Sequence, residues 1–294
     1  MVITRRAALL SLAVAPAVRS QSARPPLCIF SKHMAKFGYE DLAKHAKEIG
    51  FDGVDLTVRA EGHVLPANVA RDLPKAVAIL RERGLIVPMI TTGLLRADEA
   101  PTRPTLATAA RLKIPYWKSG YHRYTKLDAA GRVEQLAAEY RPQVAGLAAL
   151  SKEYGITCGL HNHSGDYYGS AVWDLREAMS NLDPKYIGYY FDPAHATVEG
   201  GLGNWRTSLN LVAPRLKMVS LKDFYWEKTG GKWNVRWCPI GQGMVDWPVV
   251  FKSFKAASFT GPLTLHTEYE MKDELASIAK DYEFVRSQMK AVWG

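Results

Sequence analysis

Four short stretches decide the fold of this chain: Leu160-His161-Asn162-His163, Phe191-Asp192-Pro193-Ala194-His195, Val219-Ser220-Leu221-Lys222-Asp223 and Leu265-His266-Thr267-Glu268. Each ends an apolar run in polar or ionisable side chains, and segments of helical length separate them. Successive strands of this kind are typical of a (β/α)8 barrel whose active site lies at the carboxyl ends of its strands. The sequence therefore predicts a polar pocket, rich in histidine and carboxylate, that suits a small hydroxylated molecule.

The same alternation extends over the rest of the chain. Apolar runs of strand character occur at 27–30, 53–58, 85–90, 114–118, 157–160, 187–191, 216–221 and 263–265. Segments of helical periodicity lie at 39–50, 67–83, 133–154 and 273–292, and a further helical segment ends at residue 111. Strands that alternate with helices indicate a parallel sheet, and the lack of a dinucleotide-binding glycine motif after the first strand favours a closed barrel. We predict one α/β domain, a single (β/α)8 TIM barrel over residues 24–294, with its active site at the C-terminal face.

The first 23 residues have the features of a signal peptide. Arg5 and Arg6 precede an apolar run that ends in small residues with candidate cleavage sites. The run is too short to span a bilayer permanently. The paired arginines favour the twin-arginine route, with an ordinary Sec signal as the alternative. We therefore expect a periplasmic or otherwise exported protein.

Charge and cysteine content exclude several other classes. The formal net charge is +9, and removal of the signal peptide with Arg5, Arg6 and Arg19 leaves +6 without any basic run. No nucleic-acid partner and no membrane span after signal removal are expected. The three cysteines, Cys28, Cys158 and Cys238, lack the spacing of a metal site and are predicted to be inert thiols, the first two buried in strands. The sequence leaves open whether the chain forms a homo-oligomer.

The longest segment that we expect to be irregular runs from Phe224 to Asp246. It carries Trp226, Trp233 and Trp237. A loop of this length in a barrel is usually functional, so it is expected to cover part of the pocket mouth. Its aromatic rings either stack on a sugar or pack the loop onto the barrel.

These residues resemble the sugar phosphate isomerase/epimerase-like family, the xylose-isomerase-type TIM barrels. The resemblance runs from about Leu27 to Glu270 and rests on the four stretches above together with Pro239-Ile240-Gly241-Gln242-Gly243. It implies an enzyme that acts on a small sugar, keto-sugar or polyol. The wider group also includes inosose dehydratases and ketose 3-epimerases.

The resemblance also implies a divalent metal, which the family holds with Glu, Asp, His and Glu from strands five to eight. Asp192 matches the family Asp. His161 stands at the first Glu position and Ser220 at the His position. Either His266 or Glu268 matches the last Glu, because the two are two apart and share a face. We expect Mn²⁺, Zn²⁺, Co²⁺ or Mg²⁺ on Asp192, Glu268 and His161, although two family ligands are replaced.

Isomerisation beside a carbonyl needs a base that removes a carbon-bound proton and a positive group that stabilises the enediolate. Glu268, Lys222 and His163 are the candidate catalytic residues, and Lys222 is a candidate substitute for a complete metal site. The other candidates are strand-end side chains expected to bind substrate: His195, His266, Asp223, Lys118, Arg123 and His33.

Two further functions remain as alternatives to an isomerase or epimerase. A lyase or dehydratase acting on a keto-sugar or its glycoside begins with the same proton removal. A non-catalytic sugar-binding barrel is also consistent with the replaced metal ligands. Asp192, His195, Lys222 and Glu268 form a retained set of ionisable residues that favours an enzyme.

Overall fold

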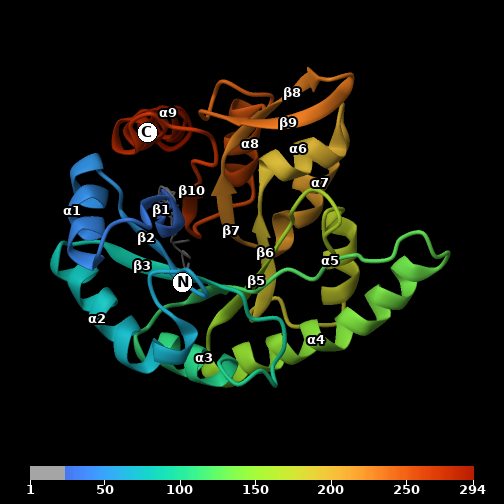
Figure 1. The fold of residues 1–294 in the computed structure, drawn as a ribbon, viewed down its shortest axis with the longest axis horizontal. Helices are drawn as coiled ribbons and strands as arrows, with labels where there is room; N and C mark the ends of the chain where they lie inside the picture. Colours follow the sequence, from blue (N-terminus) through green and yellow to red (C-terminus); the bar gives the residue numbers. More distant parts are fainter. Residues whose placement is uncertain (1–23) are drawn as a thin grey trace, which may run out of the picture.

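Eight parallel strands close into a barrel at the centre of the structure, a computed structural model that describes residues 24–294 (Figure 1). The order around the barrel is β1-β10-β7-β6-β5-β4-β3-β2. The strands are β1 (Leu27–Phe30), β2 (Gly53–Val58), β3 (Ile86–Thr92), β4 (Tyr116–Lys118), β5 (Thr157–His161), β6 (Ile187–Phe191), β7 (Leu216–Leu221) and β10 (Leu263–Leu265). The predicted barrel is confirmed. Every predicted strand lies within two residues of its observed bounds.

Helices connect the strands and cover the outside of the barrel (Figure 1). They are α1 (Tyr39–Ile49), α2 (Val69–Glu82), α3 (Thr102–Arg111), α4 (Arg132–Tyr154), α5 (Val172–Met179), α6 (Pro193–Gly200), α7 (Asn204–Val212), α8 (Trp247–Ala256) and α9 (Glu274–Trp293). Among residues 24–294 no helix is both long and apolar enough to cross a membrane. The predicted signal peptide, residues 1–23, lies outside the described residues.

The core lies between the barrel and its helices. β1, β2 and β6 are buried along their whole length, as expected of strands covered on both faces. Cys28, Cys158 and Cys238 are free and buried, and burial raises the pKa of each thiol. The prediction of unpaired, buried thiols is therefore confirmed for Cys28 and Cys158, and Cys238 is buried as well.

The segment predicted to be an irregular loop instead contains a β-hairpin. β8 (Asp223–Thr229) pairs antiparallel with β9 (Lys232–Cys238), in orange beyond the end of β7 in Figure 1. Gly230 and Gly231 form the two-residue turn, and their φ values of 58° and 80° are those that a tight hairpin turn requires. The prediction was wrong because it treated Gly230-Gly231 as part of a loop rather than as a hairpin turn.

Candidate functional site

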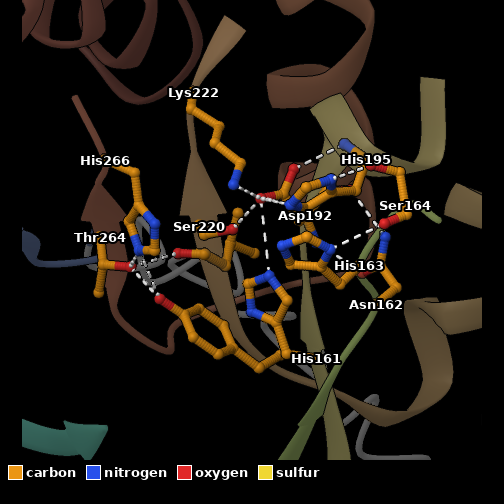
Figure 2. A network of polar contacts seen from close by, with 12 residues as sticks. His161, Asn162, His163, Ser164, Asp192, His195, Ser220, Lys222, Thr264 and His266 are labelled. Carbon is orange, nitrogen blue, oxygen red and sulfur yellow. Dashed lines mark hydrogen bonds and ion pairs between the residues drawn. The ribbon is translucent and has the colours of Figure 1, made fainter. Parts of the chain in front are cut away.

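Polar side chains from neighbouring strands meet at the carboxyl end of the barrel (Figure 2). His161 ends β5, Asp192 follows β6, Lys222 follows β7 and His266 follows β10. Because these strands are parallel neighbours, their last residues reach the same edge. The expected convergence of these side chains is observed, whereas their chemical roles stay predictions.

Asp192 is completely buried, with no exposed surface. Its backbone N–H donates to Asn162 Oδ1, and Asn162 Nδ2 donates to its carbonyl. Its Oδ1 accepts the His195 N–H at 2.9 Å and so caps α6, while Oδ2 accepts the Ser220 hydroxyl at 2.6 Å. Burial raises the pKa of Asp192 although Lys222 and these donors oppose the rise. Asp192 therefore both caps a helix and directs one oxygen toward the site.

Lys222 lies between two carboxylates. Its Nζ is 3.5 Å from Asp192 Oδ2 and 3.1 Å from Glu268 Oε2, and only 3% of the side chain is exposed. Glu268 also pairs with Lys32, at 3.3 Å. Burial raises the pKa of Glu268, but Lys222, His266 and Lys32 outweigh that effect and hold it well below its usual value. Glu268 is therefore an ionised partner of Lys222 near neutral pH.

The histidines of the site are neutral near pH 7. Burial holds the pKa of His161, His195 and His266 well below the usual value, and nearby Lys222 adds to the effect. Burial also lowers the pKa of His163, to about 4. The His163 Nδ1 lies 2.9 Å from the Ser164 carbonyl oxygen, which can only accept, so Nδ1 carries the hydrogen and Nε2 has a lone pair.

His161, Asp192 and His195 form a set of side chains that fits a divalent cation. The Nε2 atoms of His161 and His195 lie 3.7 and 3.9 Å from Asp192 Oδ2, and both nitrogens are buried without a hydrogen-bond partner. The Ser164 hydroxyl is 2.8 Å from His195 Nδ1 and fixes that ring from behind. Two imidazoles and a carboxylate suit Zn²⁺, Mn²⁺ or Co²⁺ better than Mg²⁺.

The predicted ligand set is only partly brought together. Asp192 and His161 belong to the trio described above, which His195 completes, although His195 was expected to bind substrate. Glu268 instead lies in a second trio with His33 and His266. Lys222 occupies the space between Asp192 and Glu268, so these two carboxylates bind an ammonium group where a shared metal was expected.

A buried hydrogen-bonded network lies below the site and was not predicted. The Tyr190 hydroxyl is 3.0 Å from His266 Nε2, bonds to the Thr264 hydroxyl, and donates to Asp55 at 3.3 Å. Asp55 also accepts from Thr91 at 2.8 Å. Burial raises the pKa of Asp55 to about 7, although both donors oppose it. An aspartate in the middle of an apolar strand was the available sequence indication.

A small cavity of about 100 Å³ opens above this network. Lys222, His161, His163, His266 and Glu268 line it. The other lining residues are Phe30, Lys32, Arg59, Thr91, Lys118, Tyr121 and Tyr190.

Lys118 lies where a substrate contact was expected. It is 2% exposed, and its Nζ is 3.3 Å from the centre of the Tyr121 ring. Burial holds the pKa of Lys118 well below, and that of Tyr121 well above, the usual value. His33 also borders the site, and burial lowers its pKa to about 3.

Two predicted substrate contacts lie elsewhere. The Asp223 carboxylate accepts from five donors: the N–H groups of Phe224, Gly241, Gly243 and Val245, and the Trp247 indole. It therefore anchors the chain after the hairpin, and the prediction of a substrate contact is wrong. Arg123 is exposed and stacks on Tyr167, with 4.1 Å between its guanidinium carbon and the ring centre, and it does not line the cavity.

The closed barrel with a polar cavity at its strand ends defines a TIM barrel with a candidate small-molecule site. More specifically, the chain belongs to the xylose isomerase-like TIM barrel family, whose sequence profile matches residues 43–288. The resemblance inferred from the sequence is therefore confirmed.

Individual relatives are distant. An inosose dehydratase of Bacillus velezensis is 24% identical over 152 residues, which are 46% of this chain and about half (50%) of that protein. The 3-keto-D-glucoside 4-epimerase of E. coli has a TM-score of 0.69 and 13% identity, over 90% of this chain and 100% of that one. A xylose isomerase-like protein from Mycobacterium smegmatis, in complex with magnesium, has a TM-score of 0.69 and 16% identity, over 94% and 100%. These two similarities establish the fold.

Proposed function

We propose that the protein is an enzyme that isomerises or epimerises a small sugar, keto-sugar or polyol by removing a proton beside a carbonyl. One observation carries the proposal: the buried Lys222 ammonium is fixed by Asp192 and Glu268 in a cavity that also contains neutral histidines. A cation held in this way is preorganised to stabilise negative charge on a substrate oxygen. The protein belongs to the xylose isomerase-like family, and its structural relatives include a sugar epimerase. This supports a sugar as the class of substrate.

The proton transfer is assigned to His163. Its Nδ1–H is engaged by Ser164, which leaves the Nε2 lone pair free to accept a carbon-bound proton. In isomerisation, His163 then returns the proton to the neighbouring carbon while the hydroxyl proton moves to the former carbonyl oxygen, so the reaction is balanced without a co-reactant. Epimerisation additionally requires a proton donor on the opposite face of the enediolate. Glu268 is a weaker base because its pKa is held low, and it acts by holding Lys222 in place.

We also propose that His161, Asp192 and His195 hold a divalent cation. Their unpartnered nitrogens and the Asp192 oxygen face one another, as described above. Such an ion supplies Lewis-acid polarisation of a carbonyl or hydroxyl oxygen. Lys222 is close to the same oxygen of Asp192. The positive charge of the site would therefore come from the lysine, from the cation or from both.

A second candidate is elimination from a keto-sugar or its glycoside. The similarity to an inosose dehydratase over half of that protein favours it, and it shares the first proton removal. The two reactions differ in whether a C–O bond breaks after the proton leaves.

Hydrogen exchange tests the proposal. D-Fructose, D-tagatose, inosose and 3-keto-D-glucose are incubated with the protein in D2O and followed by NMR. Wild type is expected to exchange the proton beside the carbonyl of at least one of them. Lys222→Ala and His163→Gln are expected to abolish exchange, while Lys228→Ala on the exposed hairpin retains it. Loss of a C–O bond would indicate the lyase, and absence of exchange from all four sugars would refute the proposal.

Export from the cytoplasm is proposed as well. The support is the sequence of residues 1–23, with Arg5-Arg6 before an apolar run. Fractionation of cells that express the full chain, compared with an Arg5→Lys/Arg6→Lys variant, tests it. Equal amounts of both proteins in the periplasm would contradict the twin-arginine route.

A further inference from the structure

A second, larger groove adjoins the cavity. Its volume is about 760 Å³, and six residues define its character: Tyr225, Glu227, Arg236, Trp237, Gln242 and Glu270. Glu268 lines both the groove and the cavity, so the two spaces meet at this side chain. A molecule that extends out of the cavity past Glu268 enters the groove.

Trp237 also belongs to this boundary. Its ring lies 4.5 Å from Lys222 Nζ and 5.1 Å from the His195 ring, and it lines the groove. The β8–β9 hairpin carries Trp237 on β9. These contacts make it a wall that is continuous with the candidate catalytic groups.

The hairpin presents an aromatic ring and charged groups along the groove. Tyr225 lies opposite Arg236 in the antiparallel register, so both side chains project from the same face. Arg236 Nε donates to Glu227 at 2.5 Å, and Tyr225 is 41% exposed. Lys228 pairs with Trp233 and projects from the opposite face.

This set of groups favours a neutral, hydroxylated ring. Tyr225 offers a ring face to the apolar C–H face of a sugar, and carboxylate and guanidinium groups bond its hydroxyls. Glu227, Glu268 and Glu270 balance Arg236 with negative charge, which disfavours a phosphate group. The cavity alone, at about 100 Å³, is smaller than the range of about 300–1,000 Å³ that small-molecule sites occupy, so a ligand of ordinary size extends beyond it.

We propose that the groove is a subsite for a second sugar ring, so that the substrate is a disaccharide-sized glycoside whose reacting sugar occupies the cavity. The proposal rests on the proposed function for the identity of the reacting ring. In this proposal, the β8–β9 hairpin selects glycosides over free monosaccharides.

Calorimetry with defined sugars tests the subsite. D-Glucose and D-galactose are compared with cellobiose, maltose and lactose, using wild type, Arg236→Ala, Tyr225→Ala and the matched control Lys228→Ala. At least one disaccharide is expected to bind about tenfold or more tightly than its monosaccharides, a difference of about 1.4 kcal/mol. Arg236→Ala and Tyr225→Ala are expected to remove that advantage and to leave monosaccharide affinity unchanged. Lys228→Ala is expected to retain it.

Other outcomes overturn the proposal. These are a disaccharide advantage that survives in both groove variants, equal binding of monosaccharides and disaccharides, or no binding of any of these sugars. Because binding is measured without turnover, the result is distinct from the exchange experiment. A disaccharide advantage that depends on Arg236 supports the subsite even if no proton exchange is found.

Discussion

Replacement of Lys222 by methionine tests whether its ammonium group is required by the two carboxylates around it. Methionine keeps most of the side-chain volume and removes the charge. Asp192, which is fully buried, loses its cationic partner at 3.5 Å, whereas Glu268 retains Lys32 at 3.3 Å. Asp192 is therefore the group that makes the substitution costly.

The expected loss follows from the geometry. At an effective dielectric constant of about 20, charges separated by 3.1 and 3.5 Å attract one another by about 5 kcal/mol per pair. This attraction is offset by desolvation, and removal of one partner of a buried pair typically costs about 3–5 kcal/mol. We expect Lys222→Met to lower the free energy of unfolding by about 3 kcal/mol at pH 8, because Glu268 keeps a partner.

The loss is expected to depend on pH. Burial already raises the pKa of Asp192, and removal of Lys222 raises it further. A carboxyl whose pKa is higher in the folded state than in the unfolded state loses stability as pH rises from about 4 through the folded-state value. The variant is therefore expected to be closer to wild type at pH 5 than at pH 8.

Urea unfolding at pH 5 and pH 8 measures both effects. Lys36→Met is the control, because Lys36 pairs with Glu274 on the surface, with 58% of the lysine side chain exposed. It is expected to lose less than about 1 kcal/mol at either pH. If Lys222→Met loses no more than Lys36→Met at pH 8, the buried ammonium is not needed by Asp192 and the reasoning is refuted.

Three further predictions concern the metal, the buried network and the hairpin. Asp192→Asn is expected to weaken Zn²⁺ binding in calorimetry at least tenfold, and equal affinity would remove Asp192 from the ligand set. In wild type the raised pKa of Asp55, about 7, is expected to lower stability by about 4 kcal/mol as pH rises from 4 to above 7. Asp55→Asn is expected to reduce the slope of stability against pH in urea unfolding, and an unchanged slope would contradict an ionising Asp55. Trp237→Phe is expected to abolish any fluorescence change on sugar binding. Trp233 is 63% exposed, and Trp233→Phe is expected to retain the change. The reverse result would remove Trp237 from the boundary of the cavity.

The sequence predicted the groups of the site that lie at strand ends. There the chain passes from an apolar run to ionisable side chains, and the parallel arrangement brings these positions together, as for His161 and Lys222. Asp55 and Tyr190 were not predicted because they lie within apolar strands. Their contact joins residues 135 positions apart, and no local pattern records such a pair.

The sequence did not indicate which way a polar side chain at a strand end points when several polar partners are within reach. Asp223 follows Lys222 at a strand end, which predicted that both reach the pocket. Consecutive residues of an extended chain point to opposite sides, so Asp223 turns toward the loop after β9 while Lys222 enters the cavity. Gly243 is required there because a Cβ would lie 2.1 Å from Asp223 Oδ1.

Several neighbours of Asp192 limit what its carboxylate can bind. The Ser220 hydroxyl donates to Oδ2 of Asp192, and Lys222 approaches the same oxygen. His161 and His195 direct their unpartnered nitrogens toward that oxygen as well. A cation bound by these histidines therefore shares Oδ2 with the lysine, and electrostatic repulsion sets the two positive groups in competition. Metal binding at the proposed site would therefore be coupled to the Lys222 ion pair through a single oxygen atom, so substitution of either partner is expected to change the other.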